Sequence, residues 1–275
     1  MHPESFISTQ RFYSVLMGVS AMLMFLSLQP EQHFGDSQHP LAAALLLFCG
    51  VFSGYRLADL KPRLQLLPLQ VQLNKIPVDF ILLLSIAVIF LLIARPGWHF
   101  LIQFGAAGFI AVWYYTISHF RQHHFDGLRS IYGVKNLSLA LAWAFATAPL
   151  HPGELPTLYH FGERFLYLLS LSLLIDLRDL HTDRAVMIRT VAGRLGARNT
   201  RLLAILVLIG AMLLAWDYSQ WSGDSILLPA SMISYLLTLL ASCFLTEDSS
   251  PLTYLILVDG NLLLHGILAF AFSRL

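Results

Sequence analysis

Charge is scarce in this 275-residue chain, because Asp, Glu, Lys and Arg together make up 12% of it, about half the share of an average soluble domain. Hydrophobic residues make up 57%, and the mean hydropathy is +0.67. Apolar runs recur along the whole length. The pattern excludes a soluble core with a single anchor and predicts a polytopic membrane protein.

Cysteines and the common catalytic loops are also scarce. The two cysteines, Cys49 and Cys243, both fall inside apolar runs, so we expect small apolar residues there and no disulfide or metal site. The sequence contains no Gly-rich phosphate loop and no HExxH or GxSxG motif. Its net charge of +1 gives no reason to expect a nucleic-acid partner. No cleavable signal peptide is evident near the start.

The apolar runs predict one integral-membrane domain over residues 1–275, an all-α polytopic bundle of about nine transmembrane helices. Most runs are close to the roughly 20 residues that cross a bilayer. The predicted spans are 12–29, 40–58, 77–95, 98–117, 132–150, 158–176, 201–217, 226–245 and 251–273.

The basic residues predict the orientation of this bundle. Of 17 Lys and Arg residues, only Arg95, Arg164 and Arg274 fall on the side of the membrane opposite the N-terminus. The positive-inside rule therefore places the N-terminus in the cytoplasm, and we expect the inner membrane of a bacterium. The longest polar loops lie on the same side, which predicts that the chemistry occurs at the cytoplasmic face.

The segment DLRDLHTD, residues 176–183, follows directly on an apolar run and carries three carboxylates, Asp176, Asp179 and Asp183. Residues at i, i+3 and i+7 lie on one face of a helix. Three like charges there need a cation, and carboxylates together with substrate phosphates are typical ligands of Mg²⁺. The alternative is a solvated helix end. The nearby Arg184 and Arg189 either contact phosphate or face anionic lipid.

These residues resemble the second aspartate-rich motif of the UbiA-type superfamily of intramembrane prenyltransferases, which has the form DxxDxxxD. Thr190 and the pair Leu195-Gly196 follow it, as in the family. The segment Tyr132-Gly133-Val134-Lys135-Asn136 before the fifth span is similar to a second family segment. The nine-span layout with a cytoplasmic N-terminus matches as well.

The resemblance implies Mg²⁺-dependent transfer of a prenyl group from a polyprenyl diphosphate to a lipophilic, aromatic acceptor in the membrane. It implies that Asp176, Asp179 and Asp183 are catalytic metal ligands and that Lys135 contacts the diphosphate. The expected substrate-binding residues are Arg56, Asp59, Lys61, Arg63, Tyr132, Asn136, Arg178, Arg184, Arg189 and Asp259.

The first aspartate-rich motif of the family, NDxxDxxxD, is altered in this chain. The corresponding segment is YRLADLKPR, residues 55–63. Only Asp59 remains of the acidic positions, and Arg56 and Arg63 replace two aspartates. Cationic side chains there either bind phosphate directly or mark a site that has lost its chemistry.

Two alternatives to the transferase therefore stay open: a terpene cyclase and a non-catalytic protein that binds or transports isoprenoid lipids. The aromatic residues Trp113, Tyr114, Tyr115 and Trp143 either line a carbocation pocket or pack at the membrane interface. Asp259 lies near mid-membrane in the ninth span. There it contacts either the acceptor or a neighbouring helix.

Overall fold

The structure is a computed structural model that describes residues 3–27, 40–65, 88–89, 98–117, 133–148, 155–185, 190–222 and 226–274. Within these ranges it leaves out the side chains of 3–13, 40, 54–65, 98–99, 111–117, 182, 184 and 185. Every regular element in the described ranges is helical. The elements are α1 (Pro3–Ser27), α2 (Pro40–Gln65), α5 (Trp98–Ile117), α6 (Val134–Thr147), α7 (Leu155–Arg178), α8 (Leu180–Ala185), α9 (Val191–Ser222), α10 (Leu228–Phe244), α11 (Pro251–Tyr254), the π-helix η3 (Leu255–Asp259) and α12 (Gly260–Phe272).

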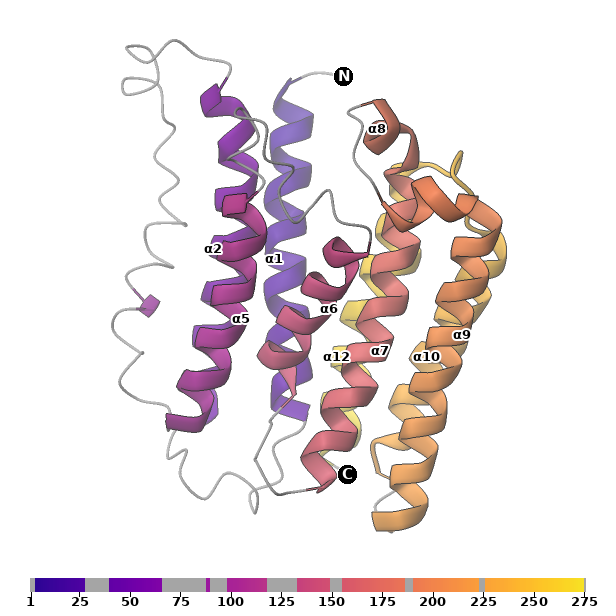
Figure 1. The fold of residues 1–275 in the computed structure, drawn as a ribbon. Coiled ribbons are helices and arrows are strands. Elements are labelled where there is room, and N and C mark those ends of the chain that lie inside the picture. Colours follow the sequence, from indigo (N-terminus) through magenta and orange to yellow (C-terminus); the bar gives the residue numbers. More distant parts are fainter. Residues whose placement is uncertain are drawn as a thin grey trace.

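The long helices pack side by side (Figure 1), and their contacts form a closed ring. Its order is α1, α2, α5, α6, α7, α9, α10 and α12, and α12 returns to pack against α1. The first and last long helices thus pack against each other, and α1, α6, α7 and α12 line a common interior cavity. The short helix α8 lies at the end of the bundle where α1 begins (Figure 1).

The predicted spans largely coincide with these helices. By length and composition, α9 and the continuous segment Pro251–Phe272 are long and apolar enough to cross a membrane. The fifth span is shorter than predicted, because α6 has 14 residues and is about 21 Å long. Gly133, at φ 78°, fixes its start, and the chain turns to extended backbone at Ala148. The predicted span 77–95 lies outside the described residues except for 88–89.

Close contact between α12 and α1 depends on Gly266. A Cβ atom at this position would lie 3.0 Å from Leu23 Cβ and 3.2 Å from the carbonyl oxygen of Ser20. Small residues at such crossings let two backbones approach within a membrane. The glycine therefore helps to close the ring.

Thr190 and Gly196, which follow the acidic segment in the sequence, both shape the start of α9. The hydroxyl of Thr190 accepts a hydrogen bond from the backbone N–H of Gly193 at 3.0 Å, as a helix N-cap does. Gly196 adopts φ 77°, a left-handed conformation that favours glycine. It separates the first turn from the long apolar part of α9.

Candidate functional site at the C-terminal end of α7

A single lysine joins two of the predicted catalytic carboxylates. The Nζ atom of Lys135 lies 2.8 Å from Asp176 Oδ1 and 3.2 Å from Asp183 Oδ2. Asp176 is 0% exposed and Asp183 is 4% exposed, so this cluster is shielded from solvent. Among the described side chains of this cluster, two carboxylates and one ammonium group leave an excess negative charge that favours binding a cation.

The third carboxylate points elsewhere, which corrects the prediction that all three share one face. Asp179 Oδ1 accepts a hydrogen bond at 2.9 Å from Nε of Arg178, and its side chain is one third exposed. Asp179 lies in the turn between α7, which ends at Arg178, and α8, which begins at Leu180. Asp183 on α8 and Asp176 on α7 both contact Lys135, while Asp179 and Arg178 form a separate pair.

Asn136 fixes the position of Lys135. Its Nδ2 atom donates a hydrogen bond of 3.1 Å to the carbonyl oxygen of Ser172 on α7. The contact joins the first turn of α6 to the last turns of α7. In this structure the predicted substrate residue Asn136 is a buried positioning group, 2% exposed.

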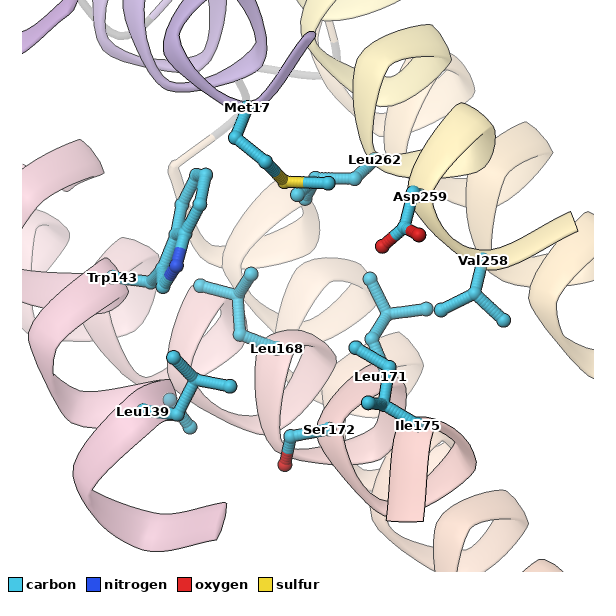
Figure 2. Close-up of a pocket in the computed structure, with 11 residues that line it drawn as sticks. Met17, Leu139, Trp143, Leu168, Leu171, Ser172, Ile175, Val258, Asp259 and Leu262 are labelled. Carbon is cyan, nitrogen blue, oxygen red and sulfur yellow. The ribbon is translucent and has the colours of Figure 1, made fainter. Parts of the chain in front are cut away.

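A cavity of about 30 Å³ lies next to this cluster, since Ile175 lines it and Asp176 is the following residue. Figure 2 shows the residues that line it. It is lined by Met17 of α1, by α6 and α7, and by the π-helix with the start of α12. Trp143 is among the lining residues, so this predicted aromatic group does face the interior. The volume is enough for a few water molecules, so a prenyl chain enters only when lining side chains move.

Asp259 is the predicted substrate residue that lines this cavity. It is 3% exposed, and its carboxylate is directed toward the cavity between α7 and α12 (Figure 2). It ends the π-helix, and such irregular turns are frequent at functional sites. The neighbouring polar residue of the ninth span, His265, lies between aromatic rings instead, 5.0 Å from the ring of Tyr167.

Several predicted contacts lie outside the described residues. Tyr132 and Arg189 are not described, and the structure describes the backbone but not the side chain of Arg184 on α8. The same holds for the altered first motif on the last turns of α2, with Arg56, Asp59, Lys61 and Arg63. These turns lie at the same end of the bundle as α8 (Figure 1).

The residues present fit a magnesium ion in part. Within the described ranges, no group of three or more His, Cys, Asp or Glu side chains comes together as a metal site. Mg²⁺ commonly uses one or two carboxylates and completes its shell with water and substrate phosphate. Asp176 and Asp183 satisfy that requirement at one place, and Asp179 does not join them.

A second buried polar cluster, near the other end of α7, escaped the sequence analysis. Glu163 Oε1 accepts hydrogen bonds from the hydroxyl groups of Ser231, at 3.0 Å, and Tyr235. Its neighbour Arg164 is 2% exposed and donates from Nη2 to Ser27 Oγ at 3.2 Å. The signal was present, because two opposite charges inside an apolar span are costly unless they are paired.

The arrangement is that of a polytopic helical membrane protein with a polar site at one end of its ring of helices. No model of a known protein family and no curated protein matches the chain. Three solved structures do match in fold. A UbiA homologue from Archaeoglobus fulgidus bound to GPP and Mg²⁺ is 14% identical, with a TM-score of 0.64 over 96% of this chain and 100% of that one.

The other two solved structures are also similar to this chain in fold. A UbiA homologue from Aeropyrum pernix K1 without ligand is 15% identical, with a TM-score of 0.55 over 95% of this chain and 96% of that one. A digeranylgeranylglyceryl phosphate synthase is 14% identical, with a TM-score of 0.55 over 97% of this chain and 94% of that one. The chain therefore has the UbiA-type fold, as its motifs predicted.

Proposed function

We propose that this protein transfers a prenyl group from a prenyl diphosphate to a lipophilic acceptor within the membrane. The observation that carries the proposal is the convergence of Asp176 and Asp183 beside the interior cavity. The likeness to a structure that holds GPP and Mg²⁺ supports it. The distribution of basic residues further favours a cytoplasmic orientation of this end.

In this proposal Asp176 and Asp183 hold Mg²⁺ together with the diphosphate. A bound Mg²⁺ supplies positive charge that stabilises the departing diphosphate. The ammonium group of Lys135 lies within 3.2 Å of both carboxylates and, with Mg²⁺ bound to them, would contact a diphosphate oxygen.

The remaining residues position the reactants and exclude water. Asn136 keeps the first turn of α6 against α7, and Trp143 presents an aromatic surface toward the allylic cation. Arg56, Lys61 and Arg63 of the altered first motif supply cationic contacts to the diphosphate in place of carboxylates. A second metal ion held by that segment is not part of the proposal.

Mass spectrometry of products tests the reaction. Purified protein is incubated with Mg²⁺ and a panel of prenyl diphosphates, with and without aromatic acceptors. Prenylated acceptor supports the transferase. Hydrocarbons or terpene alcohols formed without acceptor would indicate a cyclase, and binding without turnover would indicate an isoprenoid-binding protein.

A further inference from the structure

Asp259 is the one carboxylate among the residues that line the interior cavity. The other polar lining residue, Ser172, donates its hydroxyl to the carbonyl oxygen of Leu169 at 2.9 Å. The remaining lining residues are apolar or aromatic. An ionisable side chain at this depth is costly to keep in a membrane protein, which argues for a use in the cavity.

The backbone around Asp259 directs its side chain into the cavity. The segment from Pro251 to Phe272 is helical throughout, but residues Leu255–Asp259 form a π-helix, with the N–H of Gly260 bonded to the carbonyl oxygen of Leu255. The wider turn changes which side chains of this segment face α7. In Figure 2 the carboxylate of Asp259 lies on the cavity side, opposite Trp143.

The cavity also adjoins the proposed diphosphate site. Ser172 and Ile175 line it, and Asp176 follows directly on α7. A prenyl diphosphate held at Asp176 and Asp183 would direct its hydrocarbon chain toward Trp143 and Asp259. Met17 is a lining residue whose flexible thioether side chain can move to admit a ring.

We propose that Asp259 binds the acidic hydrogen of a protic lipophilic acceptor, of the phenol class, and receives the proton released on prenyl transfer. This role rests on the proposed function. The C–O bond of the prenyl diphosphate breaks, and its electron pair leaves with the diphosphate. An electron pair of the acceptor forms the new bond to the prenyl carbon. The acceptor's proton passes to the Asp259 carboxylate and then to water.

The first test measures binding and does not depend on turnover. Isothermal titration in one detergent compares 4-nonylphenol with 4-nonylanisole, which has no acidic hydrogen. Wild-type protein is expected to bind the phenol about 10- to 150-fold more tightly, the range for a hydrogen bond to a charged group. Asp259→Asn should reduce that preference to less than about threefold.

A matched control makes the same chemical change elsewhere. Asp217 is an exposed carboxylate that accepts a hydrogen bond from Tyr159, and Asp217→Asn should keep the phenol preference. Equal affinities for the two probes in wild-type protein, or an unchanged preference in Asp259→Asn, would overturn the proposal. A phenol preference without any prenyl transfer would retain the binding site, while the proposed enzyme function would fail.

The second test follows the products. If the acceptor's proton goes to Asp259, Asp259→Asn should still release diphosphate within about threefold of wild type. Its yield of prenylated acceptor should fall by about 10²-fold or more, the scale of general-base catalysis. Prenyl alcohol should replace the lost product, and Asp259→Glu should recover part of the transfer. An unchanged product ratio, or an equal loss of diphosphate release, would contradict the proton-accepting role.

Discussion

Two buried polar clusters lie near opposite ends of α7, about 20 Å apart along the helix, and they differ in charge balance. The inner cluster, at the C-terminal end of α7, consists of the Lys135 ammonium group and the carboxylates of Asp176 and Asp183. The outer cluster, in the N-terminal half of α7, contains the oppositely charged Glu163 and Arg164, and Glu163 also accepts hydrogen bonds from two hydroxyl groups. The outer cluster carries no net charge, and Glu163 is hydrogen-bonded within the protein, although Nε and Nη1 of Arg164 have no hydrogen-bond partner among the described residues. The described side chains of the inner cluster retain negative charge that a cation can neutralise.

From this difference we expect a structural role for the outer cluster and a functional role for the inner one. A neutral pair surrounded by donors joins α7 to α10 and α1. A cluster with excess charge costs folding free energy and is useful when a ligand supplies the missing charge. The comparison therefore predicts that inner substitutions reduce activity and that outer substitutions reduce stability.

The largest effect is expected at the inner cluster. Asp176→Asn removes one of two converging carboxylates and should lower the prenyl-transfer rate by at least about 10²- to 10³-fold, because electrostatic stabilisation of the leaving group is lost. Asp179→Asn should cost less than about tenfold, because that carboxylate belongs to a separate, partly exposed pair. Initial rates of diphosphate release measure both. An equal loss in the two variants would show that Asp179 joins the metal site when substrate binds.

Substitutions in the outer cluster should lower the stability of the protein. Glu163→Gln leaves the Arg164 charge buried without its counter-charge, which should lower the free energy of unfolding by about 3–5 kcal/mol. Thermal melts in one detergent measure the loss, and the double variant Glu163→Gln with Arg164→Gln should recover part of it. A strictly additive double variant would show that the two charges do not compensate one another.

Metal binding should depend on the diphosphate. Because Mg²⁺ relies on substrate oxygens, neither Mg²⁺ alone nor geranyl diphosphate in EDTA should raise the melting temperature much. Both together, at about 100 times the dissociation constant, should stabilise the protein by about 2.7 kcal/mol. Asp183→Asn serves as the control and should lose this joint effect. Full stabilisation by Mg²⁺ alone would indicate a preformed metal site.

The smallest effect concerns one hydroxyl group of the outer cluster. Tyr235→Phe removes one donor to Glu163 and should cost about 1.5 kcal/mol, since Ser231 still donates to the same oxygen. The melting temperature measures this change, and the prenyl-transfer rate per folded molecule should stay at the wild-type level. A large loss of activity would link the outer cluster to the reaction and remove the distinction between the two ends.

The sequence by itself determined the class of protein and most of its helices. Apolar runs of about 20 residues can satisfy their backbone in lipid only as helices or closed barrels, so composition and run length were sufficient. Lys135 and two carboxylates of the acidic segment do come together, and their role as a catalytic site stays a prediction. Those predictions depended on the length of apolar runs and the spacing of charged residues, both of which can be read from the sequence.

The tertiary structure decided which of these groups meet. Lys135 and Asp183 are 48 residues apart in sequence, and their contact depends on how α6 packs against α7 and on the turn that leads from α7 into α8. The direction of Asp179, the π-turn that directs Asp259 into the cavity, and the neutralisation of Glu163 and Arg164 all follow from interhelical packing. Helical periodicity gives the face on which a residue lies, but the neighbour that covers this face is fixed only when the ring of helices closes.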